Sequence, residues 1–394
     1  MAKKPFLGLA AVAAVMLLAT GCGASGGADP TNGGSTSGAT LEDGVPQGSW
    51  DDIVAAAKEE GTVNIGLHVG PGYDKFLAFA DHAMFEKYGI HVTGSTQSID
   101  KWASQVLSEQ AAGQYNWDLG AGPSGTALST LQPANALQLL DPWLAQLPAE
   151  TKADDKWAGG FELWADPDHH FTFVNHVDLR SSSYVNRDLV PKGMLDDEDD
   201  LTDLLDPQFA GKIVVEDPRI IGNSSNQMTW FLGDARSDLY GEDFLTKLMS
   251  TQIVVAADRE TLARDFVQGR YPVAIGADQD MVKDFIAQGL GGKSIEKLPI
   301  NNTGARGVSV LKNAPHPYAA MVMLDWFLSQ EGQDAWASLS NVSANSRRLD
   351  VEVYSPDTTP DYSKLESYQP ILGTTGGDAT IKQVLEIAKQ ELGQ

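Results

Sequence analysis

The order of short apolar strands and longer helices is the feature that most restricts the fold of this chain. Residues 50–60 carry acidic residues first and basic residues later, as helices do, and Gly61 stops the helix before an apolar strand at 63–67. The same alternation continues with helices at 74–87 and 102–112 and strands at 90–93 and 117–120. Strands that alternate with helices of ten or more residues predict a parallel sheet with helices on both faces.

Parallel α/β sheets bind ligands at the carboxyl ends of their strands. In this chain the segments that follow the first strands are 68–72, 95–98 and 121–126. We therefore expect these three loops to surround one crevice.

A second set of strand and helix signals follows residues 171–175, which read as an apolar strand leading into a second lobe, and it runs to about Gly304. The predicted elements of this set are strands at 212–216 and 271–275, helices at 242–249 and 260–267, and a helix opened by 222–226. After it we expect a strand at 307–311, a strongly amphipathic helix at 317–329 and a last helix at 381–392. A body of this length exceeds one ordinary core and predicts about two domains.

The first residues have the order of a secretory signal, which we place at 1–21. Basic Lys3 and Lys4 precede an apolar run over 6–19 that is too short to span a bilayer comfortably. Cys22 follows at once and is the single cysteine of the chain, so disulfides within it are excluded. We expect Cys22 to be the lipidated first residue of a lipoprotein; the alternative is ordinary cleavage that leaves a stray thiol.

Residues 22–48 are mostly Gly, Ser, Ala, Thr and Pro, a composition that cannot bury enough apolar surface to offset chain entropy. We interpret this segment as a flexible linker between a lipid anchor and the globular body. The expected location is the cell membrane, with the lipid-anchored protein facing the extracellular or periplasmic side.

The charge balance excludes some partners. Fifty-three acidic residues stand against 28 basic ones, for a formal net charge of −25. Phosphates of nucleic acids need basic patches, so we expect no nucleic-acid partner.

Two short motifs come close to known ion- and phosphate-binding sequences. The acidic run at 196–200 lacks the glycine of a calcium loop, because Leu201 stands there, and it is read as a solvated loop. Residues 287–294 come within one residue of a phosphate-binding loop, but the first glycine is missing and Pro299 interrupts the helix that should follow.

Catalytic and metal signals are also weak. Residues 122–125 approach a hydrolase nucleophile elbow, but Thr126 replaces the required second glycine. The neighbours His169 and His170 would point to opposite faces of a strand and cannot chelate together. We expect no enzyme, no cofactor and no metal.

Three stretches carry a resemblance to a known family, and the resemblance covers about residues 50–350. They are WDDIVAAAKEEGTVNI at 50–65, DLLDPQFAGKIVVEDPRIIG at 203–222 and PHPYAAMVMLDWFLSQEGQDAWA at 315–337. In these the chain is similar to the extracellular solute-binding proteins of ATP-binding-cassette importers, in the branch with the ferric-iron, thiamine and polyamine binders.

The resemblance implies an α/β, two-lobed type II periplasmic-binding-protein fold, with two crossing strands and a ligand cleft between the lobes. We expect lobe 1 to consist of 49–174 and 305–345, and lobe 2 of 175–304 and 346–394. A solute that contacts both lobes stabilises the closed state and shifts a pre-existing equilibrium. The closed form would deliver the solute to a membrane permease, and we expect the binding protein to be a monomer.

The resemblance also indicates which residues should line the cleft. The expected ligand-binding residues are His68, Gly70, Ser98 and Ser124 from lobe 1, Asn223, Ser224, Ser225 and Asp278 from lobe 2, and Arg306 near the returning crossover. Residues 223–226 precede a helix, where free N–H groups favour an anion or a hydroxyl-rich ligand, although they can equally be plain N-caps. His68 is either a ligand contact or an ordinary loop histidine.

The residue types in the predicted cleft loops indicate the chemical class of the solute. Ferric-iron relatives carry adjacent tyrosines in the loop that here reads Ala277-Asp278-Gln279, so iron is disfavoured. Serine, asparagine and arginine favour an organic acid, phosphonate or phosphate ester, while polyamine, thiamine or ferric iron stay as alternatives. Four aromatic residues near strand ends either stack on a ligand or pack in the core: Tyr73, Trp102, Trp164 and Trp230.

Three other functions are a secreted hydrolase, a structural lipoprotein and a solute sensor. A secreted hydrolase needs a nucleophile next to a base, and a structural lipoprotein usually shows repeats; the sequence has neither signal. A solute sensor for a membrane receptor stays open, because sensing and import use the same closed lobes.

Overall fold

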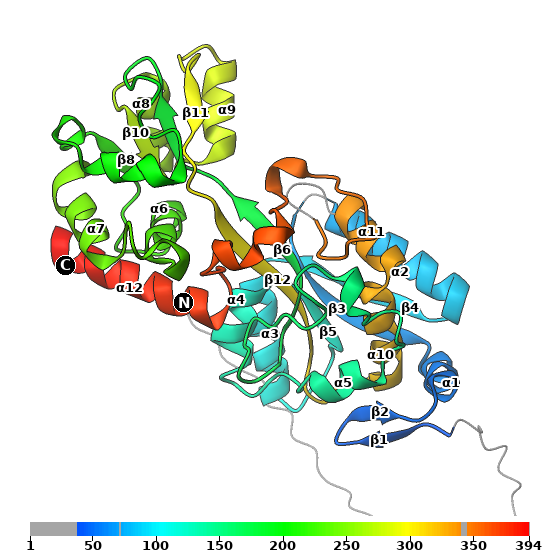
Figure 1. Ribbon diagram of the computed structural model, residues 1–394. Coiled ribbons are helices and arrows are strands. Elements are labelled where there is room, and N and C mark those ends of the chain that lie inside the picture. The colour runs from blue at the N-terminus through cyan, green and yellow to red at the C-terminus, as the bar shows by residue number, and fades with distance from the viewer. Residues whose placement is uncertain (1–37, 71, 340–344, 394) are drawn as a thin grey trace, which may run out of the picture. The chain divides into compact units, whose positions relative to one another are not determined.

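The computed structural model describes residues 38–70, 72–339 and 345–393 (Figure 1). The predicted signal segment and Cys22 lie outside the described residues. The helices are α1 Trp50–Glu60, α2 Tyr73–Tyr88, α3 Ile99–Ala111, α4 Ser124–Thr126, α5 Asp141–Gln146, α6 Asn223–Met228, α7 Glu242–Lys247, α8 Arg259–Val267, α9 Gln279–Ala287, α10 Pro317–Leu328, α11 Gln330–Leu339 and α12 Thr375–Leu392. Short 3-10 or π turns connect them at Ala127–Leu131, Asp154–Lys156, Glu198–Leu205, Pro207–Phe209, Thr229–Leu232, Asp234–Arg236, Leu248–Gln252, Pro356–Thr358 and Tyr362–Tyr368.

The first sheet has the strand order β4-β3-β5-β12-β6. Its strands are β3 Thr62–His68, β4 His91–Gln97, β5 Leu119–Pro123, β6 Phe173–Arg180 and β12 Asn302–Val310. The three strands predicted from the βα alternation run parallel, whereas β12 pairs antiparallel with both of its neighbours. The sheet is therefore mixed, because a strand from late in the chain is inserted beside β5.

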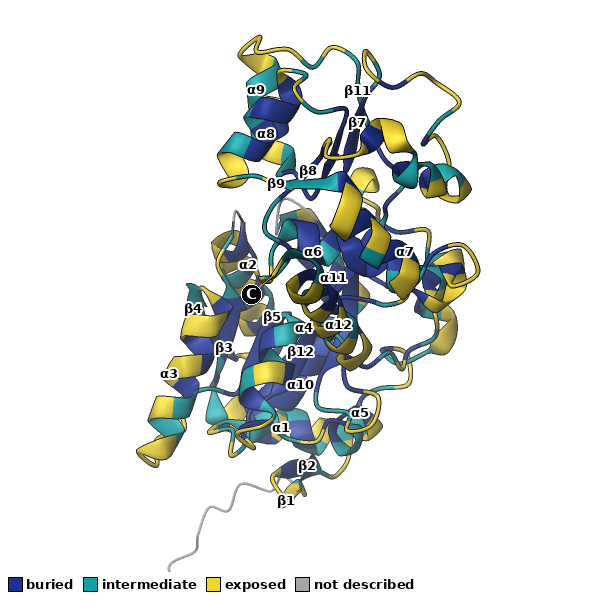
Figure 2. Ribbon diagram, turned by 90° about the vertical axis from the view of Figure 1, so that its left-hand side faces the viewer, coloured by how far each residue is buried: buried dark blue, intermediate teal, exposed yellow. Residues whose placement is uncertain are grey.

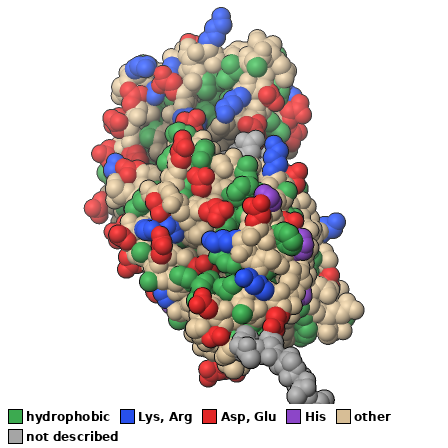
Figure 3. Space-filling model, turned by 90° about the vertical axis from the view of Figure 1, so that its right-hand side faces the viewer, with side chains coloured by type: hydrophobic (Ala, Val, Ile, Leu, Met, Phe, Trp, Pro, Cys, Tyr) green, Lys and Arg blue, Asp and Glu red, His purple; other side chains and the backbone are tan. Residues whose placement is uncertain are grey.

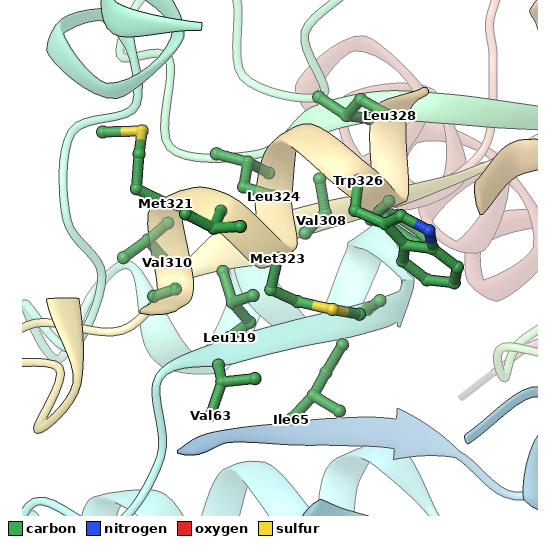
Figure 4. Packing of buried hydrophobic residues seen from close by; sticks show 14 of the residues in the cluster. Val63, Ile65, Leu119, Val308, Val310, Met321, Met323, Leu324, Trp326 and Leu328 are labelled. Carbon is green, nitrogen blue, oxygen red and sulfur yellow. The ribbon is translucent and has the colours of Figure 1, made fainter. Parts of the chain in front are cut away.

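One face of this sheet is covered by α1, α2 and α10, and their side chains form its main core. Figure 4 shows Met323 of α10 pointing toward the side chains of β3 and β5, among them Ile65 and Leu119, whereas Met321 and Leu324 point away from these strands. The prediction that this helix is strongly amphipathic is wrong, because residues 319–328 are all buried. The helix lies between the sheet and its neighbours α1 and α11, so no face is left for water.

The second sheet has the order β11-β7-β10-β8-β9. Its strands are β7 Tyr184–Asn186, β8 Ile213–Val215, β9 Ile253–Val255, β10 Val273–Ile275 and β11 Ile295–Lys297. Strands β9, β8 and β10 are parallel, while β7 pairs antiparallel with β10 and β11. In Figure 2 the strands of both sheets are largely buried and the outer faces of the helices are exposed.

Strands β6 and β12 are the long antiparallel pair that connects the two sheets along the chain. Their register runs from Asn302 opposite Arg180 to Val308 opposite Phe173, with an irregularity after Arg306. Gly307 sits at that irregularity, where a Cβ atom would lie 2.5 Å from the Phe173 carbonyl oxygen. The chain passes to the second sheet after β6 and returns through β12, which agrees with the two crossing strands implied by the resemblance.

The end of the chain divides between the two cores. Arg347 is buried against the first sheet, where its guanidinium donates to the carbonyls of Val174, Ala158, Gly160 and Phe161 at 2.7–2.9 Å. Helix α12 packs instead on the core of the second sheet and lies beside α6 and α7 (Figure 1). The segment before α12 thus belongs with the first core, although the expected lobe 2 began at 346.

Two strands precede the first helix and form a small hairpin of their own, β1 Thr40–Glu42 and β2 Val45–Gln47. They lie in the segment that was expected to be a flexible linker, so the ordered body begins earlier than expected. No helix in the described part of the chain is long and apolar enough to cross a membrane.

Candidate functional site

The carboxyl end of β3 places a histidine beside a tyrosine. His68 closes the strand, and Tyr73 opens α2 after a short loop. Their ring centroids are 6.4 Å apart, with the planes nearly perpendicular. Burial lowers the pKa of His68, and the positive charge of Arg306 lowers it further. The lowered pKa favours the neutral form of His68. Its Nδ1 atom is buried and has no hydrogen-bond partner among the described residues.

Arg306 extends from β12 toward the same place. Its Nη1 donates to the hydroxyl of Tyr73 at 3.3 Å, and its side chain is 15% exposed. Its Nε is buried, without a hydrogen-bond partner among the described groups, and lies 3.9 Å from a carboxylate oxygen of Asp178. A guanidinium has five N–H donors, so this one keeps unused donors at the carboxyl-end edge of the sheet.

Asp178 connects this arginine to a second one. Its Oδ2 accepts from Nε of Arg180 at 2.8 Å, and its side chain is 5% exposed. Burial by itself would raise the pKa of Asp178, but Arg180, Arg306 and His176 outweigh burial and lower it to about 2. Two guanidinium groups therefore share a single carboxylate, which leaves one positive charge uncompensated within this group.

Arg180 and Asp178 also line a pocket of about 270 Å³ that continues onto the second lobe. The other lining residues are Leu179, Ser181, Ser182, Asn223, Asn226, Gln227, Asp278, Gln279, Asp280, Thr358 and Leu372. The side chain of Gln227 holds the wall in place, because it accepts from Ser182 and donates to the carbonyl of Arg180 at 3.1–3.2 Å. The volume suits a small solute.

The serines predicted for this pocket serve the fold instead. The Ser224 hydroxyl donates to the Ile275 carbonyl at 2.6 Å and accepts from the backbone N–H of Glu216. The Ser225 hydroxyl accepts from the N–H of Gly222 and donates to the Ile220 carbonyl. Both side chains are fully buried. Their hydroxyls are therefore satisfied within the second lobe and do not face the pocket.

The beginning of α6 already holds a carboxylate. Glu216, which follows β8, accepts from the N–H of Asn223 at 2.9 Å and pairs with Arg259 at 2.6 Å. The carboxylate of Glu216 would repel an anionic solute at this helix terminus, so such a solute could bind there only by displacing it. The capping alternative describes residues 223–226 better, and only Asn223 and Asn226 of this run reach the pocket.

Asp278 reaches the pocket and also caps α9. Its Oδ1 accepts from the N–H groups of Asp280 and Met281, both at 3.1 Å. Its charge also acts on Tyr184 of β7, which does not line the pocket and whose hydroxyl is buried and has no hydrogen-bond partner in the part of the chain that the structure describes. Burial raises the pKa of Tyr184, and the charges of Asp278 and Asp280 raise it further.

Three other predicted residues take less direct positions. Gly70 has no room for a side chain, since a Cβ atom would lie 2.8 Å from the Tyr73 ring. Ser98 is exposed at the start of α3 and makes no side-chain cap bond. Ser124 is buried at a cavity of about 20 Å³ behind β5, where its hydroxyl has no described partner. Their roles in ligand binding stay predictions.

Most of the aromatic and histidine side chains that the sequence suggested as ligand or metal contacts instead pack against other parts of the protein. Trp102, Trp164 and Trp230 are buried in the cores, and Tyr73 is the single aromatic of the four that contacts Arg306. His170 stacks on Trp164 with centroids 4.4 Å apart and contacts Asp141. Within the described ranges no three His, Cys, Asp or Glu side chains form a group able to hold a metal ion.

Sequence reasoning missed Asp178, Arg180, Gln227 and Tyr184. The expected strand at 171–175 ended too early, whereas β6 continues to Arg180. The alternation of Val177 and Leu179 with polar neighbours was the signal for the longer strand. Extending it would have brought Asp178 and Arg180 to the strand end, but not revealed their shared partner.

Comparison with solved structures shows the fold. Similar structures include iron-bound HitA from Pseudomonas aeruginosa (20% identity, TM-score 0.51, 84% of this chain and 100% of that one). Others are IdiA (FutA) of Trichodesmium with iron and citrate (15%, TM-score 0.54, 84% and 99%) and apo ferric ion-binding protein A of Pasteurella haemolytica (16%, TM-score 0.53, 85% and 100%). At these identities the likeness carries the two-lobed periplasmic-binding fold and confirms that prediction.

Sequence comparison shows the family. An uncharacterized protein of Haemophilus influenzae is 30% identical over 142 residues, which are 34% of this chain and 38% of that protein. This chain therefore matches well under half the length of that relative. The family model of bacterial extracellular solute-binding proteins matches residues 69–334, which include the second sheet, the strands of the first sheet other than β3, and most of the pocket lining. The chain belongs to the bacterial extracellular solute-binding proteins.

Proposed function

We propose that this protein captures a small organic anion, such as an organic acid, a phosphonate or a phosphate ester, and delivers it to an ATP-binding-cassette permease. The observation that carries this proposal is Arg306, a mostly buried guanidinium whose Nε lacks a hydrogen-bond partner among the described residues. Arginine donors match the geometry of carboxylate and phosphoryl oxygens. An anion at Arg306 would satisfy the unused donors.

The neighbours of Arg306 support the same ligand class. Arg180 and Arg306 share Asp178, so the group carries a surplus positive charge before any solute binds. The unpartnered Nδ1 of His68 adds a hydrogen-bonding atom, and Tyr73 orients the guanidinium through its hydroxyl. An anion gains more from such a partly buried group than it would at an exposed arginine.

Ferric iron is a weaker candidate for this chain, although several proteins of similar fold bind it. The loop after β10 offers Ala277-Asp278-Gln279 in place of an adjacent tyrosine pair. One carboxylate oxygen of Asp278 already accepts hydrogen bonds from two backbone N–H groups, so this residue is poorly placed to coordinate a metal ion.

The anion proposal is tested by isothermal titration of refolded protein, freed of any copurified solute, with propylphosphonate and small carboxylic acids. Arg306→Gln should weaken binding of the anion that binds by at least about tenfold, because truncating one partner of a buried charged contact costs a few kcal/mol. Arg219→Gln is the matched control, since Arg219 also pairs with an aspartate but does not share the contacts of Arg306 with Tyr73 and Asp178. Unchanged affinity in Arg306→Gln would contradict the proposal.

We propose further that Cys22 carries the lipid that holds the protein at the outer face of the cell membrane, and that the protein works there as a monomer. Support comes from the order of the basic residues, the apolar run and the single cysteine. Cys22→Ser should abolish incorporation of labelled fatty acid and release the protein from the membrane fraction. Retained label in this variant would refute the assignment.

A further inference from the structure

The pocket has two walls of opposite charge. One wall carries Arg180, whose partner Asp178 is shared with Arg306. The other wall carries Asp278 and Asp280, at the beginning of α9. No ion pair joins either of these two carboxylates to a basic side chain in the described portion of the protein. A purely anionic solute that fills the pocket would therefore meet uncompensated negative charge.

An acidic surface alone would mean little in this protein. Figure 3 shows acidic side chains scattered over a whole face of the molecule, as expected for a formal charge of −25. Asp278 differs from those residues because it is partly buried and lines a pocket of about 270 Å³. Asp278 thus belongs to a built cavity and is not simply part of a solvated face.

The charge of these two carboxylates also acts on a buried group that does not line the pocket. The hydroxyl of Tyr184 is buried and unpartnered among the described groups, in a residue that is 4% exposed. Asp278 and Asp280 are the charged groups that act on this phenol. Because Asp278 and Asp280 have no basic partner among the described residues, the positive charge that would offset them at this wall of the pocket is missing.

The missing group must be a hydrogen-bond donor with positive charge. The carboxylates accept but do not donate, and one oxygen of Asp278 is already used by two backbone N–H groups. A protonated amine has three donors and one positive charge, so it can donate to the free oxygen of Asp278 and offset its charge. A neutral hydroxyl would leave the charges of Asp278 and Asp280 uncompensated.

We infer that the solute is a zwitterion, with its anionic group against Arg306 and Arg180 and its protonated amine against Asp278. This inference rests on the proposed capture of an organic anion and specifies the second end of that molecule. Aminated carboxylic acids and aminophosphonates belong to this chemical class.

The test compares three probes of equal chain length by isothermal titration of refolded protein: 3-aminopropylphosphonate, propylphosphonate and propylamine. The zwitterion should bind at least about tenfold more tightly than propylphosphonate, and propylamine should bind most weakly. If propylphosphonate equals or exceeds the zwitterion, the inference fails while the capture of an anion stands. If neither phosphonate binds, or if propylamine binds as well as the zwitterion, the proposed anion site fails too.

The substitution Asp278→Asn isolates the charge, because asparagine is also a good N-cap and preserves the start of α9. It should weaken the zwitterion by at least about tenfold and leave propylphosphonate bound as well or better. Asp258→Asn is the matched control, since Asp258 caps α8 of the same lobe through the N–H of Thr261 at 2.7 Å but does not line the pocket. Equal losses for both phosphonates in Asp278→Asn would overturn the inference.

Discussion

Replacing Asp178 with asparagine should destabilise the protein by about 2 kcal/mol at neutral pH. Burial opposes ionisation of this carboxyl, yet Arg180, Arg306 and His176 lower its pKa from 3.8 to about 2. Each pKa unit corresponds to about 1.4 kcal/mol of preference for the charged form, and asparagine resembles the uncharged form in shape. Because the side chain is 5% exposed, solvent screening reduces this figure little.

The assay is urea unfolding of both proteins, followed by tryptophan fluorescence between neutral and acidic pH. Asp178 has a folded pKa below its unfolded one, so its contribution is complete above pH 3.8 and is lost as the pH falls through about 2. The two proteins should therefore differ at pH 7 and converge at the acid end. Equal unfolding midpoints at pH 7 would refute the argument that the two arginines outweigh burial.

A matched control exists elsewhere in the chain. Asp217 and Arg219 repeat the Asp-x-Arg arrangement, with Nε and Oδ1 2.9 Å apart, but both side chains are 31% exposed. Asp217→Asn should leave the unfolding midpoint nearly unchanged, because exposed ion pairs contribute little.

The substitution Asp178→Asn should also affect ligand binding. It frees two guanidinium groups from their shared carboxylate, so it should tighten the binding of propylphosphonate.

Three further predictions concern the fold. Arg347→Gln should destabilise the protein by about 3–5 kcal/mol in urea unfolding, because it leaves buried carbonyls without their donor; a loss below about 1 kcal/mol would contradict this role. Burial raises the pKa of Glu60 to about 7, so stability should fall as the pH rises from 4.5 through 7, and Glu60→Gln should flatten that part of the profile. Gly66→Ala should cost about 1–3 kcal/mol, since its Cβ would lie 2.0 Å from the buried ring of Trp102; an unchanged melting temperature would contradict the packing.

Much of the fold could be predicted because its signals are local. Apolar spacing and stop residues marked α1, α2 and α8 to within a residue or two of their observed bounds, and Gly61 and Gly89 end helices in the left-handed conformation that favours glycine. The resemblance at three stretches added the two lobes and the family, both of which the comparisons bear out.

Local patterns failed where the environment of an element comes from distant parts of the chain. The helix α10 was expected to have a polar face, but its neighbours α1 and α11 cover the side away from the sheet. The segment that contains Arg347 was assigned to the other lobe, because its carbonyl partners lie nearly 190 positions away along the chain. Ser224 and Ser225 sat in the right loop, yet their hydroxyls were taken up by nearby backbone.

The sequence by itself thus determined the class of fold, the family and the loops among which a cleft must form, since helix periodicity, strand composition and capping act over a few residues. Only the tertiary structure decided which side chains in those loops keep unused hydrogen-bonding capacity. Asp178 and Asp278 line one pocket, and Arg306 lies beside Asp178, although the three are separated by at least 28 positions; the pairing of β6 with β12 and the start of α9 bring their charges to this place. That arrangement depends on long-range strand pairing and burial, which no local pattern records.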